Sequence, residues 1–268
     1  MGAELPGWRL VRIESQNAFA NMAIDEAILT ARIASFVPNT VRFYQWKTSA
    51  VSIGRFQKIE NEVQLRNCKS LGVDVVRRIT GGGAVYHDAE NEITYSVVAG
   101  ERELQSQDVA TAYRKIYSGL VEALNILGLT ADFEKGNDRT CPNLTIRGRK
   151  ISGSAQCHKR GVVLQHGTLL LDVNLEKMFT LLRVPWATTC LDIVNVAKNK
   201  ITSIANEIGK TPSLDKVHQA LIDGYGKAMN TDFAVEGLTP YERELARRLG
   251  EEKYGTEDWN FRGKNLNA

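Results

Sequence analysis

The sequence has few cysteines, and none of them stands in a pair that could bind zinc. Four occur in 268 residues, at Cys68, Cys141, Cys157 and Cys190, and no two form a C-x-x-C motif. So few cysteines in a chain of this length exclude a disulfide scaffold and make a zinc ribbon improbable. We therefore expect reduced thiols and a cytoplasmic protein.

Long apolar runs and a strong charge imbalance are also missing. No stretch approaches the roughly 20 apolar residues that a membrane span requires, and the start MGAELPGWRLVRIES lacks the basic and apolar blocks of a signal peptide. The net charge is only +3, from 34 basic and 31 acidic residues. Neither a membrane nor a nucleic acid is an expected partner, although an anionic substrate is permitted. Without repeats or a low-complexity linker, residues 1–268 are expected to form a single domain.

Apolar periodicity predicts strands that follow one another closely, with helices between groups of them. Residues 109–128 give the clearest helical pattern, and Gly148 predicts a turn between strands at 143–148 and 149–156. Residues 40–46 and 50–56 are expected to pair as strands around a short turn. The last third is expected to be mainly helical. The pattern indicates an α+β fold, a two-layer α/β arrangement with a mostly antiparallel sheet flanked by helices.

Three consecutive glycines follow a β-branched strand in RRITGGGAVYHD, residues 77–88. Such a turn lets backbone N–H groups approach an oxyanion, and Arg77 and Arg78 would add positive charge. The run lacks the G-K-[ST] of a Walker loop. From composition alone, a tight surface turn is an equally good interpretation.

Three further segments contain reactive side chains. Lys150 in GRKISGSAQ could hold an anion or a developing oxyanion, although a lone lysine on a strand is usually exposed. His166 in LQHGTLLLD stands in an apolar strand, where a buried structural histidine is the more common finding. Asp138 in GND could bind Mg²⁺ beside phosphates or belong to a turn. Cys141 could be a nucleophile or a small buried apolar residue.

The order and spacing of these segments closely resemble the lipoate–protein ligase family, and NMAIDEAIL, VRFYQW, SIGRFQ and EEKYGTEDWN are similar to its flanking signatures. The resemblance covers most of the chain. It implies the catalytic-domain fold shared by biotin and lipoate ligases. It also implies ATP-dependent activation of lipoate to lipoyl-AMP, then transfer to a lysine of a lipoyl carrier domain of the 2-oxoacid dehydrogenase E2 or glycine cleavage H protein type.

The resemblance also implies roles for individual residues. Lys150 would be the catalytic residue, contacting the acyl carbonyl and the phosphate, and Asp138 would bind Mg²⁺ with ATP. Arg78 would compensate the phosphate charge. The remaining expected substrate and nucleotide contacts are Gly81, Gly82, Gly83, Ala84, Val85, Tyr86, His87, Gly153, Ala155 and His166.

Many members of this family have a C-terminal accessory domain, which is not expected here, so a separate accessory subunit is one option. The leading alternative is an octanoyltransferase, which shares the fold and moves an acyl group from acyl carrier protein through a cysteine thioester without ATP. Cys141 would then be the nucleophile. A non-catalytic carrier-protein binder and a biotin ligase fit the motifs less well.

Overall fold

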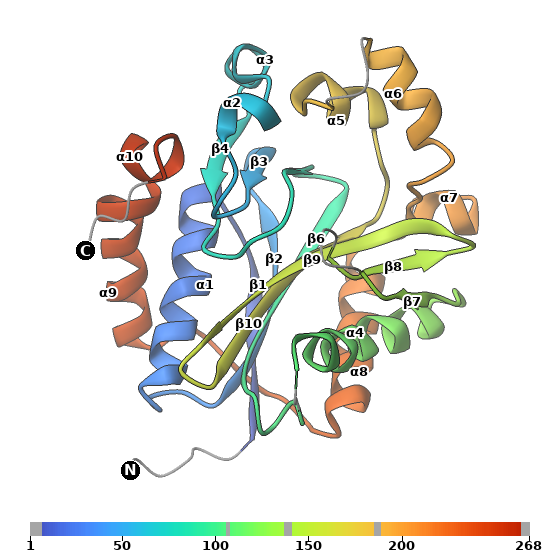
Figure 1. The fold of residues 1–268 in the computed structure, drawn as a ribbon. Coiled ribbons are helices and arrows are strands. Elements are labelled where there is room, and N and C mark those ends of the chain that lie inside the picture. The colour runs from blue at the N-terminus through green and yellow to red at the C-terminus, as the bar shows by residue number, and fades with distance from the viewer. Residues whose placement is uncertain (1–6, 106–107, 137–140, 185–188, 264–268) are drawn as a thin grey trace.

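The computed structural model describes residues 7–105, 108–136, 141–184 and 189–263 (Figure 1). An eight-stranded sheet crosses the molecule in the order β11-β1-β2-β6-β10-β9-β8-β7. β1 runs parallel to both β11 and β2, and the other neighbouring strands are antiparallel. Its strands are β1 (Trp8–Gln16), β2 (Asn39–Trp46), β6 (Glu92–Gly100), β7 (Asp132–Glu134), β8 (Asn143–Ile146), β9 (Arg149–Lys159), β10 (Val162–Leu170) and β11 (Ala234–Glu236).

Successive residues of the central strands enter two different cores, because side chains alternate across a sheet. Leu10 and Val97 pack with the helices α4 (Val109–Ile126) and α8 (Leu214–Met229). Val11 and Val98 face the other way, toward α1 (Ala18–Ile33) and α9 (Pro240–Leu249). Helices therefore cover both faces of the sheet (Figure 1). The predicted class, a mostly antiparallel sheet flanked by helices, is confirmed, but helices on both faces make three layers and not the two that were predicted.

Side-chain caps fix where these helices begin. Asp108 accepts a hydrogen bond from the Thr111 amide at the start of α4, and Ser213 caps α8 in the same way. Thr239 and Glu242 form a capping box at the start of α9, with Pro240 at the first position of the helix. Glu242 also binds the buried guanidinium of Arg9 on β1, so this cap ties α9 to the sheet.

A second sheet of three strands lies beside the large one. Its order is β4-β3-β5, with β3 (Ala50–Ile53) parallel to β4 (Asp74–Arg77) and antiparallel to β5 (Val85–His87). The predicted pairing of 40–46 with 50–56 is therefore wrong. β2 is already bonded to β1 on one edge and to β6 on the other, so no edge remains for β3.

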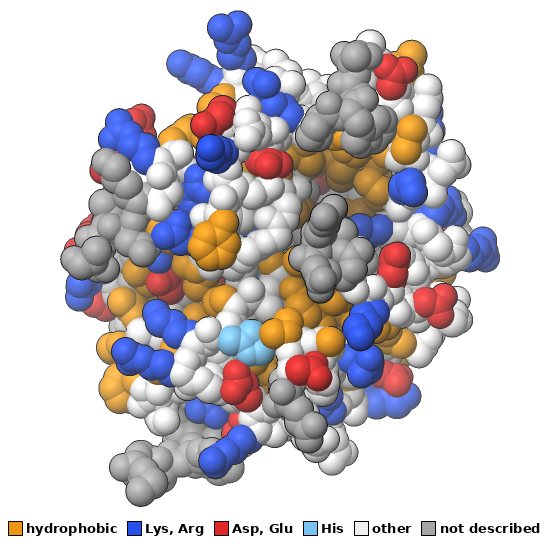
Figure 2. Space-filling view, in the orientation of Figure 1, with side chains coloured by type: hydrophobic (Ala, Val, Ile, Leu, Met, Phe, Trp, Pro, Cys, Tyr) orange, Lys and Arg blue, Asp and Glu red, His pale blue; other side chains and the backbone are white. Residues whose placement is uncertain are grey.

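Short helices surround the small sheet and the open side of the large one. They are α2 (Ile59–Glu62), α3 (Leu65–Ser70), α5 (Leu175–Leu181), α6 (Cys190–Ala197), α7 (Ile204–Ile208) and α10 (Glu257–Asn260), with one π-helical turn at Gly250–Tyr254. Among the described residues, none of the helices has the length and apolar character to cross a membrane. On the face in Figure 2, basic and acidic side chains are interspersed, in keeping with the small net charge.

Candidate active site

A cavity of about 530 Å³ lies between the small sheet, the strands β9 and β10, and α5. The sequence predictions converge on it. Of the predicted substrate and nucleotide contacts, Gly81 alone among the described residues does not line it, and Asp138 falls outside the described residues. The predicted residues that line it are Arg78, Gly82, Gly83, Ala84, Val85, Tyr86, His87, Lys150, Gly153, Ala155 and His166, together with Cys141.

Arg78 uses all five of its N–H groups within the protein. Nε donates to the Thr80 hydroxyl (3.3 Å), and Nη1 donates to the carbonyl and the hydroxyl of Ser52 (2.9 and 2.8 Å). Nη2 donates to the carbonyls of Gly81 and Gly83 (2.8 and 2.9 Å). A guanidinium has five donors, so none remains for a phosphate. Burial lowers its pKa to about 10, which leaves it charged near neutral pH. Arg78 therefore fixes the glycine loop.

The hydrogen bonds from Arg78 also orient that loop. In a trans peptide the N–H points opposite to the preceding C=O. The carbonyls of Gly81 and Gly83 face Arg78, so the N–H groups of Gly82 and Ala84 point away from the guanidinium. Within the described residues, neither N–H donates a hydrogen bond. Gly82 has a φ of +87°, which favours glycine, and its carbonyl lies directly against Gly54.

Each of the two hydroxyls that Arg78 contacts lies next to a buried histidine, and the two hydrogen-bonded arrangements are alike. Thr80 Oγ1 lies 2.8 Å from His166 Nε2, and His166 Nδ1 lies 2.9 Å from Asp25. Because Arg78 can only donate, the Thr80 hydroxyl donates to His166, whose Nδ1–H then donates to Asp25. Burial lowers the pKa of His166, against the opposing effect of Asp25. The imidazole is therefore neutral.

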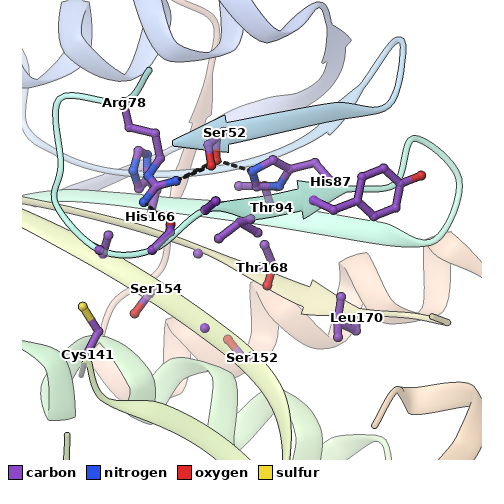
Figure 3. A pocket seen from close by; sticks show the side chains of 18 of the residues that line it. Ser52, Arg78, His87, Thr94, Cys141, Ser152, Ser154, His166, Thr168 and Leu170 are labelled. Atoms are coloured by element: carbon purple, nitrogen blue, oxygen red, sulfur yellow. Dashed lines mark hydrogen bonds between the residues drawn. The ribbon is translucent and has the colours of Figure 1, made fainter. Parts of the chain in front are cut away.

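The second series of hydrogen bonds from Arg78 passes through Ser52 and His87 (Figure 3). Ser52 Oγ lies 2.7 Å from His87 Nε2, and His87 Nδ1 lies 2.8 Å from Glu92. The indole of Trp46 stacks on the His87 ring at 4.0 Å between centroids. A hydroxyl, a histidine and a carboxylate form each chain, and both end on one guanidinium. Asp25, Ser52, Thr80 and Glu92 were not predicted as site residues, since they are polar groups scattered along unrelated segments.

Cys141 lies across the cavity from Arg78 and His166, beside Ser154 (Figure 3). A Cβ placed on Gly82 would lie 3.6 Å from Cys141 Sγ and 3.4 Å from Arg78 Nη2, so Gly82 separates the sulfur from the guanidinium. The thiol is partly exposed and is not in a disulfide. The sequence left two roles open for Cys141, a nucleophile and a small buried apolar residue. Its partly exposed position in the cavity is more consistent with a nucleophile.

Lys150 lies at a break in the β8–β9 ladder. Thr145 pairs with Lys150 and Leu144 pairs with Ser152, so Ile151 is an extra residue that forms a bulge. The backbone of Lys150 accepts a hydrogen bond from Thr202 N (2.9 Å) and donates one to Lys200 O (2.8 Å). Its ammonium group then lies over Gly153, where a Cβ would collide with it.

The charge of Lys150 depends on its surroundings. Solvent reaches the ammonium group through the cavity, but the protein around it desolvates the group and lowers the pKa of Lys150. A negative charge on Cys141 acts in the opposite direction on Lys150 and also on Arg78.

Arg77, predicted with Arg78 as a source of positive charge, has a structural role. It is buried, and its guanidinium donates to the carbonyls of Gly54, Gln57, Trp259 and Asn260 among others. Its own carbonyl accepts from the Trp259 indole (2.8 Å). Arg77 thus joins the strand that leads into the glycine loop to the segment around α10.

Among the described residues, no group of three or more His, Cys, Asp and Glu side chains could hold a metal ion. The predicted Mg²⁺ ligand Asp138 lies outside those residues. The cavity therefore combines a thiol, an ammonium group and unpaired backbone N–H groups, without a described metal site. This chemistry suits transfer of an acyl group to or from sulfur.

The large sheet with helices on both faces, together with an acyl-sized cavity under a glycine loop, defines the class of α/β enzymes that attach acyl cofactors to proteins. The chain belongs, more narrowly, to the lipoyl protein ligase A/B catalytic-domain family, whose model matches residues 17–226. The resemblance inferred from the motifs is confirmed.

Individual relatives are similar over nearly the whole chain. Octanoyltransferase LipM of Clostridioides difficile (strain 630) is 38% identical, with 94% of this chain and 98% of the relative covered. Octanoyltransferase LipM of Brevibacillus brevis is 36% identical, with 95% and 99% covered. Among solved structures, a bi-partite lipoate protein ligase of Thermoplasma acidophilum, studied with its E2 lipoyl domain, has a TM-score of 0.84 at 31% identity, with 97% and 98% covered. A lipoate-protein ligase A bound with ATP has a TM-score of 0.83 at 31% identity, with 96% and 99% covered.

These relatives overturn the main functional prediction from the sequence. An ATP-dependent lipoate–protein ligase was expected, whereas the relatives that match at 34–38% identity over nearly the whole chain are octanoyltransferases. The motifs misled because the ligases and the transferases share them. The coarser prediction, an enzyme of the lipoate ligase and octanoyltransferase family, is confirmed.

Proposed function

We propose that this enzyme is an octanoyl-[acyl carrier protein]:protein octanoyltransferase that works through a thioester on Cys141. The observation that carries the proposal is the cysteine in the cavity, close to Arg78 and within the electrostatic reach of Lys150. The octanoyltransferase relatives support the same reaction. The acceptor would be a lysine of a lipoyl domain, the kind of partner that accompanies the Thermoplasma acidophilum ligase.

The reaction would run in two balanced steps. The Cys141 thiolate attacks the carbonyl carbon of the octanoyl thioester, the bond to the carrier sulfur breaks, and the released carrier thiolate takes up a proton. The neutral ε-amine of the acceptor lysine then attacks octanoyl-Cys141. An amide forms, the C–S bond breaks, and the proton lost by the amine returns to the Cys141 sulfur.

Three groups would stabilise the charge that develops in each step. The ammonium of Lys150 and the N–H groups of Gly82 and Ala84 would donate hydrogen bonds to the tetrahedral oxyanion and so stabilise its negative charge. No phosphate takes part, so neither ATP nor Mg²⁺ is required. The five internal hydrogen bonds of Arg78 agree with this, because they leave its guanidinium no donor for a nucleotide. The apolar part of the cavity would hold the octanoyl chain.

Cys141→Ala provides the test. The parent enzyme, mixed with octanoyl-acyl carrier protein without ATP, should gain one octanoyl group on Cys141 by intact-mass analysis and peptide mapping. A lipoyl domain added next should remove that group and become octanoylated. Cys141→Ala should do neither, whereas Cys157→Ala, which changes a thiol whose pKa burial raises to about 12, should behave like the parent. An unmodified parent enzyme, or transfer that requires ATP, would contradict the proposal.

A further inference from the structure

The cysteine that carries the proposed thioester lies in a short segment with few constraints of its own. Cys141 and Pro142 precede β8, and proline has no N–H to donate. Within the described residues, the backbone of these two positions makes one hydrogen bond, from the Tyr117 hydroxyl to the Pro142 carbonyl at 3.1 Å. Since Pro142 is bonded directly to Cys141, this contact constrains the backbone that carries the sulfur, while the Tyr113 side chain is hydrogen-bonded to the Cys141 thiol itself.

Tyr117 is well placed to act as an anchor. It lies on α4, is 1% exposed and packs in the main core, so its ring has little freedom to move. Its hydroxyl accepts a hydrogen bond from the Ser154 hydroxyl at 2.8 Å, which directs its own proton to Pro142. Ser154 lies on β9 and lines the cavity beside Cys141 (Figure 3). We call this series of hydrogen bonds, from Ser154 to Tyr117 to Pro142, the relay. It joins a strand, a helix and the segment that contains the proposed nucleophile.

The relay remains intact over a wide pH range. Burial raises the pKa of Tyr117 well above its ordinary value, so the phenol keeps its proton and continues to donate. None of the three groups is charged, and the arrangement does not depend on salt. A fixed neutral donor suits a positioning role, because it adds no charge to a site where oxyanion charge must be stabilised by Lys150.

We propose that Tyr117 is a positioning residue for the acylation of Cys141, acting through the Pro142 carbonyl and held in place by Ser154. The inference rests on the proposed function. Tyr117 takes no part in the bond changes. Its contribution is to keep Sγ aligned with the incoming thioester, because misplacement of a reacting atom by about 1 Å costs on the order of a hundredfold in rate.

Tyr117→Phe removes the hydroxyl and keeps the ring in the core. In single-turnover acylation by octanoyl-acyl carrier protein, followed by intact mass, the rate of octanoyl-Cys141 formation should fall roughly tenfold to a hundredfold. The Kd for the octanoyl donor and the thermal midpoint should change little. Tyr225→Phe is the matched control, because Tyr225 is equally buried in the same core, and its hydroxyl has no partner among the described residues. This control should acylate at the parent rate.

Ser154→Ala provides a second, independent variant. It should slow acylation less than Tyr117→Phe does, and the double variant should be no slower than Tyr117→Phe alone, because both changes break one relay. An unchanged acylation rate in a folded Tyr117→Phe, or additive effects in the double variant, would refute the positioning role. Failure of the parent enzyme to form octanoyl-Cys141 would instead refute the proposed function, so the two results are distinguishable.

Discussion

At the scale of single residues, Arg78 shows how a charged group can serve a site without touching the substrate. Its guanidinium holds two hydroxyls, and each hydroxyl orients a histidine that rests on a buried carboxylate. The same group turns the carbonyls of the glycine loop away from the N–H groups that are left free for an oxyanion. Burying a charged guanidinium costs free energy, and this cost is offset only while each of its N–H groups has an acceptor.

Arg78→Lys keeps the charge but supplies three donors instead of five. At least two of the acceptors, which include buried groups, would lose their partner, at about 1–3 kcal/mol each. We therefore expect the free energy of unfolding in urea to fall by about 2–6 kcal/mol, with loss of acyl transfer. Arg248→Lys, an exposed arginine of a surface pair on α9, should change stability by no more than about 0.5 kcal/mol. Similar stabilities for the two variants would show that the hydrogen bonds of Arg78 are dispensable.

At the scale of elements, the bulge in β9 and the glycine that follows it place Lys150, for which we propose the role of an oxyanion donor. The side chain of Lys150 lies in the space that a Cβ on Gly153 would occupy, while its backbone is held by the segment at Lys200–Thr202. Without the extra residue of the bulge, the side chain of Lys150 would leave the strand in a different direction. The irregularity is therefore part of the site.

Gly153→Ala should displace the Lys150 ammonium group without removing it. Acyl transfer should fall by roughly two orders of magnitude, the scale of losing one oxyanion-type donor, and Lys150→Ala should give a similar loss. The measurement is the kcat of octanoyl transfer to a lipoyl domain, with unfolding monitored in parallel. Gly237→Ala is a suitable control, because a Cβ there meets nothing within 4 Å. A fully active Gly153→Ala would show that the lysine can work from another position.

The same elements show how far the sequence could lead. The glycine loop, Lys150 and the hairpin at Gly148 were predictable because their residues are close together in the chain. The pairing of His166 with Asp25 was not, because 141 residues separate them and neither is unusual alone. The pairing of 40–46 with 50–56 failed because competition for strand edges is a property of the whole sheet. The choice between ligase and transferase failed because the residues of the motifs fit either enzyme, and the relatives, which are octanoyltransferases, decided it.

At the scale of the whole molecule, the buried His166 couples stability to pH. The folded state lowers the pKa of His166 through burial, whereas an unfolded histidine titrates near about 6.5. The unfolded state therefore binds more protons below that pH. The stabilisation is complete above about pH 6.5 and is lost as the pH falls through the lower folded-state pKa.

We expect the free energy of unfolding in urea to decrease between pH 7.5 and pH 5.5. His166 can contribute at most about 1.4 kcal/mol per pH unit. His166→Asn should flatten the curve but not level it, because burial lowers the pKa of His218 as well. A curve for His166→Asn as steep as that of the parent would exclude this origin of the pH dependence.

The contacts of Arg77 have a consequence for the order in which the enzyme is made. Its guanidinium and amide need acceptors from Trp259 and Asn260, which lie 182 and 183 residues further along the chain. A ribosome synthesises those residues only after the helices and strands that lie between them and Arg77 in the sequence. Until then Arg77 has only the nearby carbonyls of Gly54, Arg55 and Gln57 as acceptors. The strand that leads into the glycine loop is therefore fully held only once α10 has been made, and a nascent chain that stops before α10 should have an unfinished site.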